Sequence, residues 1–208
     1  PRTERDDIDA LTFTPLGSDT PMSWKEALGA NYTDAIVVLH KGKIVYERYM
    51  GVTTPASQHI AFSVTKSYIG TLAASLAAEG KLDPDKLVTD YVPELADSGF
   101  AGATVRHVMD MTTGIAFDET YTNADADIIR HARAGRAAPR RANYDGPDGF
   151  LAFLPTIGKQ GEHGERFTYR TANSDALGWI IARATGVPVR DQLEQRFWSK
   201  LGMEQDAA

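Results

Sequence analysis

Two short apolar runs rich in β-branched and aromatic residues lie close together in residues 34–51 (DAIVVLHKGKIVYERYMG). A turn that contains Gly42 separates them, and this arrangement is typical of a β-hairpin. A hairpin alone is marginally stable, so we expect these strands to belong to a sheet, although no partner strand is evident elsewhere in the chain. Residues 1–22, which are polar with scattered Pro and Gly, are interpreted as a lead-in.

Helical periodicity dominates the remainder of the chain. In residues 61–80 apolar side chains recur at helical spacing, with Ser63 near the predicted beginning and Gly80 just after the end. Because this helix is rich in Ala and apolar on nearly every side, the pattern predicts that it is buried. Further helices are predicted over residues 104–111, 123–134, 148–154, 173–185 and 189–201.

These elements indicate an α/β fold in which helices outnumber strands. We expect an antiparallel sheet, to which the hairpin at 34–51 belongs, flanked by helices, together with a mostly helical region over residues 60–203. A chain of 208 residues is long enough to bury the core of one domain, and the prediction is a single domain over residues 1–208.

The composition excludes several classes of function. The net charge of −6 disfavours nucleic acid as a partner, and we interpret the arginine-rich segment 131–141 as a solvated loop face. No apolar run approaches the ~20 residues that cross a membrane, so no membrane partner is expected. The chain has no Cys, and its five His residues show no metal-binding spacing, so neither a metal nor a cofactor is predicted. We expect a cytoplasmic location, with the periplasm and secretion left open.

The strongest candidate for chemistry is the pair Ser63 and Lys66. Residues three apart project from one face of a helix, so the lysine amine can reach the serine hydroxyl. A serine needs an adjacent base to act as a nucleophile, and burial would favour the neutral amine that can serve as one. Backbone N–H groups at the helix N-terminus would suit a developing oxyanion. The pair alone is also consistent with a capping serine and a surface lysine.

Four segments in order extend this picture, and they are residues 61–95, 104–115, 166–186 and 196–203. They resemble the serine β-lactamase, penicillin-binding protein and esterase superfamily in its class C-like branch, which includes the family VIII esterases. The resemblance, with the hairpin, covers about residues 34–203 and implies a β-lactamase-like fold. It also implies an acyl-enzyme hydrolase in which Ser63 is the nucleophile, Lys66 is its base, and Tyr169 relays a proton to the leaving group.

One position departs from the pattern of the β-lactam-handling relatives. Thr171 stands where they have an asparagine, and a hydroxyl makes fewer hydrogen bonds than an amide. This difference favours linear amides or esters over β-lactams as substrates. A small hydroxyl residue at this position resembles the 6-aminohexanoate-oligomer (nylon-oligomer) hydrolases and carboxylesterases. The segment FDETY, residues 117–121, adds to that resemblance, which implies that Tyr121 and Thr171 bind substrate. A β-lactamase or D,D-peptidase stays open, and so does a non-catalytic penicillin-recognising binding domain.

Three further expectations follow. Asn173 is interpreted as the N-cap of the helix after it. The acidic loop around Asp118, Glu119 and Asp125 is interpreted as solvated, with a contact to a substrate ammonium group left open.

The third motif that the resemblance implies, with one oxyanion donor, is not present after residue 186. We therefore expect an N-terminal part of a longer enzyme, completed by a C-terminal segment or a second chain. A homodimer also stays open.

Overall fold

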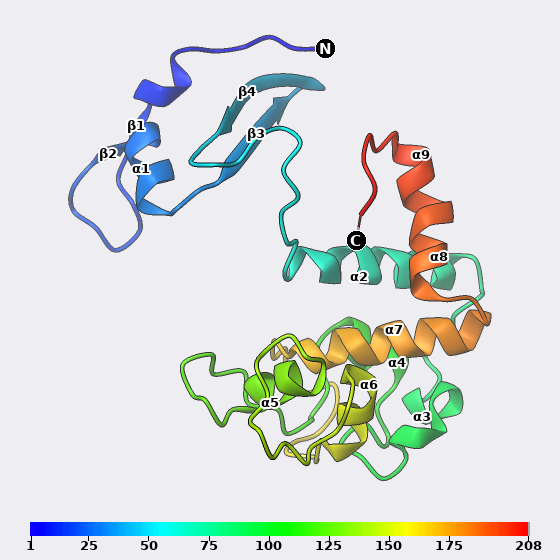
Figure 1. Ribbon diagram of the computed structural model, residues 1–208. Helices are drawn as coiled ribbons and strands as arrows, with labels where there is room; N and C mark the ends of the chain where they lie inside the picture. The colour runs from blue at the N-terminus through cyan, green and yellow to red at the C-terminus, as the bar shows by residue number, and fades with distance from the viewer. Residues whose placement is uncertain (208) are drawn as a thin grey trace. The chain divides into compact units, whose positions relative to one another are not determined.

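The computed structural model describes residues 1–207. It divides into two compact units, the first over residues 1–60 and the second from Ala61 onward (Figure 1). The strands lie in the first unit, whereas the described part of the second holds isolated β-bridges, helices and loops. The α/β composition is as expected, while a single domain over 1–208 stays a prediction.

The predicted hairpin is confirmed. Strands β3 (Ala35–His40) and β4 (Lys43–Tyr49) pair antiparallel, with an irregularity in register between Val38 and Leu39. Lys41 and Gly42 at the turn both have positive φ values, 49° and 72°. Positive φ at both central residues is the requirement of a two-residue turn that matches the right-handed twist of the strands.

Residues 1–22 are more than the lead-in that their polarity suggested. This segment holds a 3₁₀ turn η1 (Ile8–Ala10) and strand β1 (Thr12–Phe13), which pairs with β2 (Met22–Ser23) at its end. Helix α1 (Trp24–Ala30) follows directly. Ile8 is buried in a small core with Leu28 and Tyr46, and the Tyr46 hydroxyl donates to Asp9 at 2.5 Å. A single apolar residue, Ile8, thus anchors a polar segment on the hairpin.

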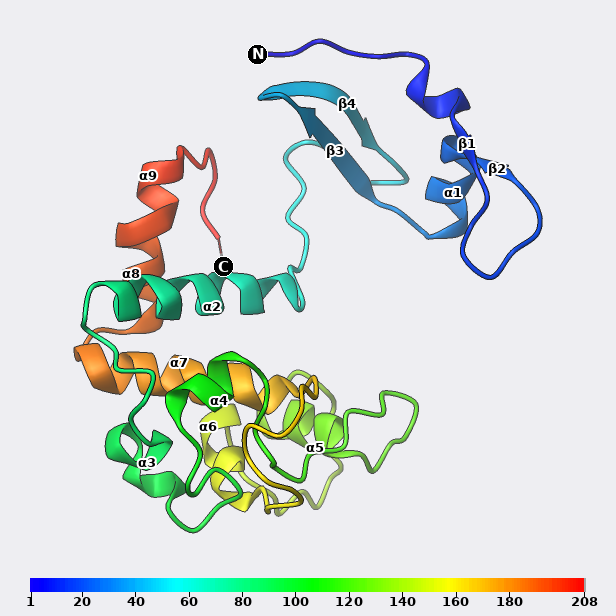
Figure 2. The same ribbon diagram turned by 180° about the vertical axis from the view of Figure 1, so that it is seen from behind.

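The second unit is built around two helices of 15 residues, α2 (Val64–Ala78) and α7 (Thr171–Thr185). Its elements are α2 (Val64–Ala78), α3 (Val88–Tyr91), η2 (Pro93–Leu95), α4 (Val105–Met109), α5 (Asp127–Ala134), α6 (Phe150–Phe153), η3 (Leu154–Thr156), α7 (Thr171–Thr185), α8 (Val189–Leu193), the π-helical turn η4 (Glu194–Trp198) and α9 (Ser199–Leu201). Helix α2 runs beside α7, and α3, α5 and α6 lie on the opposite side of α7 in both views (Figures 1 and 2).

The main core lies around α7. Its buried side chains include Leu177, Ile180 and Ile181, and the second half of α2 adds Leu72 and Leu76. Each such side chain contributes about 1.5–3 kcal/mol when it is removed from water, so this contact orders the two helices. The prediction that α2 is buried throughout is wrong for its first half. There the side chains are exposed or half-buried in the described structure, and Val64 is 59% exposed.

Two glycines adopt or permit backbone arrangements that other residues would not allow. Gly186 ends α7 in the left-handed conformation, at φ 69°, directly after the predicted helix over residues 173–185. Gly114, in the Thr-Thr-Gly turn after α4, meets the loop around Gly161. A Cβ at Gly114 would lie 2.0 Å from the Gly161 carbonyl oxygen, so only glycine lets these two backbone segments approach.

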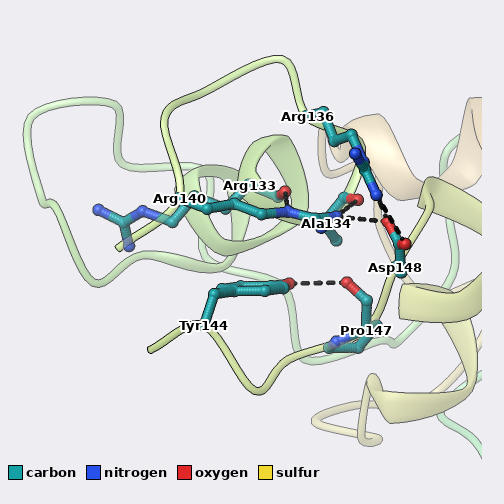
Figure 3. A network of polar contacts seen from close by, with 7 residues as sticks. All are labelled: Arg133, Ala134, Arg136, Arg140, Tyr144, Pro147 and Asp148. Carbon is teal, nitrogen blue, oxygen red and sulfur yellow. Dashed lines mark hydrogen bonds and ion pairs between the residues drawn. The ribbon is translucent and has the colours of Figure 1, made fainter. Parts of the chain in front are cut away.

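The arginine-rich segment 131–141 is engaged within the unit. Arg140 donates to the carbonyl oxygens of Arg133 and Ala134, at 2.7 and 2.6 Å, at the C-terminal end of α5 (Figure 3). The same two oxygens also accept from the backbone N–H groups of Arg136 and Gly149. Arg136 and Arg140 both pair with Asp148, and these hydrogen bonds lower the pKa of that carboxyl to about 2. These guanidinium groups stabilise a helix end and a loop.

Among residues 1–207, no helix combines the length and the apolar character that crossing a bilayer requires.

Candidate active site

Ser63 lies immediately before α2, at a strained point of the backbone. The preceding residue, Phe62, has a φ of 43°, which is unusual for a bulky side chain and is found at functional turns. Ser63 occupies the N-cap position, yet its side chain caps no backbone N–H group. The capping interpretation of this serine is therefore wrong, and its hydroxyl is free for other partners.

Two side chains converge on the Ser63 hydroxyl. Lys66 Nζ lies 2.9 Å from Ser63 Oγ, one helical turn further along α2. The Tyr169 hydroxyl lies 2.7 Å from the same oxygen, although 106 residues separate the two positions. Lys66 Nζ is also 5.2 Å from the centre of the Tyr169 ring. The contact between α2 and α7 brings these residues together, because Tyr169 stands just before α7.

The backbone beside Ser63 offers a free donor. The next three N–H groups, those of Val64, Thr65 and Lys66, donate to the carbonyl oxygens of residues 61, 62 and 63. The Ser63 N–H has no acceptor within the part of the chain that the structure describes. An N–H group at a helix N-terminus can stabilise a negatively charged oxygen, and this one is adjacent to the hydroxyl.

The site is more open than the sequence suggested. Lys66 is half-buried and Tyr169 is 39% exposed, whereas the apolar pattern predicted a buried helix around Lys66. The first half of α2 is exposed because the core of this unit begins only at Leu72.

Tyr121 and Thr171, the two predicted substrate-binding residues, meet through a third residue. Glu119 accepts hydrogen bonds from the Thr171 N–H at 2.8 Å, from the Thr171 hydroxyl at 2.5 Å and from the Tyr121 hydroxyl at 2.8 Å. Burial, followed by the bond to Glu119, raises the pKa of Tyr121 above its usual value. The phenol therefore keeps its proton at neutral pH.

Glu119 is the functional candidate that the sequence reasoning missed. The acidic loop was interpreted as solvated, but Glu119 is half-buried and accepts three hydrogen bonds. Asp118 does fit the loop interpretation, because its carboxylate accepts from the Thr120 N–H within the same turn. Glu119 stands two residues before Tyr121, but its partner Thr171 is 52 positions away, so no local pattern reveals the contact.

A buried polar cluster supports the loop that carries Tyr169. Arg170 donates to the Thr113 carbonyl oxygen at 2.8 Å, and the Thr113 hydroxyl donates to Asn173 Oδ1 at 2.7 Å. Asn173 is fully buried inside α7, which begins at Thr171, so the prediction that it caps the helix is wrong. These bonds join the turn after α4 to the beginning of α7.

Relatives of known name were found for most of the chain. It is 37% identical over 184 residues to the 6-aminohexanoate-dimer hydrolase of Paenarthrobacter ureafaciens, covering 88% of this chain and 46% of the relative. It is 28% identical over 196 residues to Esterase EstB of Burkholderia gladioli, covering 81% of this chain and 45% of the relative. The chain therefore spans about half the length of these curated relatives.

A solved structure agrees with these relatives. A Bacillus anthracis protein provisionally named 6-aminohexanoate-dimer hydrolase superimposes with a TM-score of 0.88 and is 31% identical. The superposition covers 99% of this chain and 53% of that protein. The β-lactamase-like fold expected from the sequence is therefore confirmed, as a chain that covers about half of the relatives.

The family can be assigned from a sequence profile as well. The profile described as Beta-lactamase matches residues 26–207, which includes α2, α7 and the residues around Ser63. With this match and the 37% identity, the chain belongs to the beta-lactamase family.

Proposed function

We propose that this protein is a serine hydrolase that forms an acyl-enzyme on linear amide or ester substrates. One observation carries the proposal, namely that Lys66 Nζ and the Tyr169 hydroxyl both lie within hydrogen-bond distance of Ser63 Oγ. A serine with two groups that can exchange protons is an activated nucleophile, whereas a serine that merely caps a helix would bond to backbone N–H groups.

Each group has a role in the proposed reaction. Ser63 Oγ attacks the carbonyl carbon of the substrate, and its proton passes to the neutral amine of Lys66. The oxygen of the tetrahedral intermediate faces the Ser63 N–H. Tyr169 then supplies a proton to the leaving nitrogen or oxygen as the scissile bond breaks. A water molecule hydrolyses the ester on Ser63 by the same proton transfers in reverse.

Two arguments support linear amides and esters. The relatives described above carry the names of a 6-aminohexanoate-dimer hydrolase and an esterase. In addition, the Thr171 hydroxyl, at the position of the asparagine in β-lactam-handling relatives, donates to Glu119. Its proton is thus used within the protein, so it cannot hold a substrate carbonyl as an amide N–H₂ would.

Covalent labelling tests the nucleophile. The protein is incubated with a fluorophosphonate, its intact mass is measured, and the adduct is mapped to a peptide. We expect one adduct, on Ser63, and none in Ser63→Ala. Ser67→Ala is the matched control, because Ser67 is an exposed serine on the same helix and should leave labelling unchanged. An adduct at any other residue would contradict the assignment.

Turnover tests the reaction class. We expect hydrolysis of p-nitrophenyl esters and of anilides by the wild type and its loss in Ser63→Ala. Nitrocefin should be a poor substrate by comparison, and efficient nitrocefin turnover would favour a β-lactamase instead. If the wild type and Ser63→Ala showed no difference in turnover, the proposal of an enzyme would be refuted. The non-catalytic binding domain would then remain as the alternative.

A further inference from the structure

The loop of residues 158–168 leads into Tyr169 and lies along residues 111–114, which contain the Thr-Thr-Gly turn after α4. The Thr168 N–H, directly before Tyr169, donates to the Met111 carbonyl oxygen at 2.9 Å. Three more N–H groups of the loop donate to carbonyl oxygens of the Thr-Thr-Gly turn, those of Gln160, Gly161 and Gly164. The position of Tyr169 therefore depends on how this loop is held against residues 111–114.

His163 joins the same loop and turn through its side chain. Its Nδ1 accepts a hydrogen bond from the Gly114 N–H at 3.0 Å, and its Nε2 lies 3.0 Å from the Ala101 carbonyl oxygen. A carbonyl oxygen can only accept, so Nε2 carries a proton and donates it, whereas Nδ1 must be unprotonated to accept. The neutral imidazole with its proton on Nε2 is thus the form that satisfies both partners.

The surroundings of His163 disfavour a second proton on its ring. Burial lowers the pKa of His163 below its ordinary value of 6.5, while the bond to Ala101 opposes this shift. Lys159 and His107 lower the pKa further, and the negative charge of Glu162 acts against them. His107 comes from α4 and stacks on the ring, with 5.9 Å between the ring centres and 20° between the planes. The other two segments against the ring meet it through backbone groups.

Protonation of His163 would remove the bond to Gly114. A proton on Nδ1 turns this atom from an acceptor into a donor, and it would then face the Gly114 N–H, which is also a donor. The chain is attached to residues 111–114 on both sides of Tyr169, by the Thr168 N–H and by the Arg170 side chain. A change at Gly114 therefore reaches Tyr169 through the backbone bonds of one short turn.

We propose that His163 is a positioning residue whose neutral side chain holds the loop on the Thr-Thr-Gly turn and so keeps the Tyr169 hydroxyl beside Ser63. The proposal rests on the function proposed above and gives that site a dependence on pH that arises outside it. A lowered folded-state pKa means that this support is complete above about pH 6.5 and is lost as the pH falls further. In mild acid the loop loosens, and Tyr169 transfers its proton less effectively.

The test is the pH profile of p-nitrophenyl ester hydrolysis by the full chain, from about pH 8 to about pH 5. His163→Asn places an amide oxygen near the position of Nδ1, which can accept from Gly114 but does not titrate in this range. Between these limits we expect the wild-type kcat to fall roughly three- to tenfold more than that of His163→Asn, the effect of one hydrogen bond. His163→Ala should lose a similar factor in kcat even at neutral pH, with KM nearly unchanged, because Tyr169 acts on the leaving group.

His40→Asn is the matched control for the loss of a histidine. His40 is exposed at the end of β3, so the pH profile of this variant should equal that of the wild type. If His163→Asn shows the same fall in kcat towards acid as the wild type, another group causes the fall and the proposal is overturned.

An NMR titration of the wild type tests the proposal without any variant that must fold. The ring signals of His163 give its pKa, and we expect the Gly114 amide proton to shift with the same midpoint. A Gly114 signal that does not follow His163, or a kcat profile without an inflection at this midpoint, overturns the proposal. Absence of both turnover and a Ser63 adduct in the wild type would instead refute the proposed function, while the Gly114 signal would still test the hydrogen bond itself.

Discussion

At the scale of single residues, the Tyr169 hydroxyl can be separated from the Tyr169 ring. The hydroxyl contacts Ser63 Oγ, whereas the ring is partly exposed and lies near Lys66 Nζ. Tyr169→Phe keeps the ring and removes only the proton donor. We expect kcat to fall about 10²–10⁴-fold, the range for one general acid–base group, with Tm nearly unchanged. Steady-state kinetics and a thermal melt check this, and a wild-type kcat in the variant would remove Tyr169 from the mechanism.

The pair Thr113 and Asn173 offers a test of buried polar packing. Thr113 is 2% exposed, Asn173 is fully buried, and Asn173 Nδ2 has no partner among the described residues. Thr113→Val leaves Asn173 Oδ1 unpaired as well, and we expect a loss of about 1–3 kcal/mol in unfolding free energy. The double variant with Asn173→Leu should recover much of this loss, because neither polar partner remains. Denaturant titrations measure both, and a double variant less stable than Thr113→Val would contradict the argument.

Single residues also show what the sequence could predict of the site. Ser63 and Lys66 are three positions apart on one helix, so their contact follows from helical geometry. Tyr169 could be predicted only through the resemblance to a family, because 106 residues separate it from Ser63 in the sequence. The role of Glu119 could not be predicted from the sequence. Its half-buried position depends on how its loop packs against the beginning of α7, and its charge in an acidic loop suggested solvent.

At the scale of helices and strands, locally encoded features were predicted and the others were not. Gly80, Gly186 and Gly202 follow helices and adopt positive φ, so the helix ends agree with the sequence. Helix α7 begins two residues earlier than predicted, because its first N–H donates to distant Glu119. Helix α1 was missed although Ser23 and Glu26 form a capping box, since its seven residues make only two turns and show no clear helical period.

The C-terminal end of α5 supports a prediction about stability. Arg140 donates to the carbonyl oxygens of Arg133 and Ala134, which also accept from backbone N–H groups, and its side chain is mostly buried. Arg140→Ala should cost about 1–2 kcal/mol and lower Tm by about 2–8 °C. Arg140→Lys should be intermediate, because one ammonium group cannot reproduce the fork of N–H donors. If Arg140→Ala melts at the wild-type temperature, the end of α5 does not depend on these bonds.

The same end of α5 should respond to acid through Asp148. Arg136 and Arg140 lower the pKa of this carboxyl to about 2, below its ordinary value. A lowered folded-state pKa contributes stability that is complete above the unfolded-state pKa and disappears as pH falls toward 2. The Tm difference between the wild type and Asp148→Asn should therefore be largest near neutral pH and shrink below about pH 4. Thermal melts of both proteins from pH 7 to pH 3 measure this Tm difference. A Tm difference that stays constant over this range would contradict the pairing.

At the scale of the whole molecule, the class of fold was predictable and the role of its first residues was not. The hairpin and the helices carry strong periodic patterns, and four segments in order resembled a known superfamily. The packing of Ile8 onto Leu28 and Tyr46 depends on one apolar residue in a polar stretch, which no periodicity marks. The chain spans about half the length of its curated relatives, so the activities in their names are only proposed for this chain.

The distribution of charge over the molecule leads to a last prediction. The chain carries a net charge of −6, and three arginines in and beside the arginine-rich segment are paired with carboxylates of the protein. Arg130 pairs with Asp127, and Arg136 and Arg140 share Asp148, so few counterions would be released on contact with DNA. We expect no binding of a fluorescein-labelled DNA duplex at physiological salt, measured by anisotropy, and only weak binding at low salt. Asp148→Asn releases two arginines and serves as the comparison, since it alone should raise the low-salt signal. Wild-type binding that weakens steeply with added salt would show that these arginines remain available to phosphate.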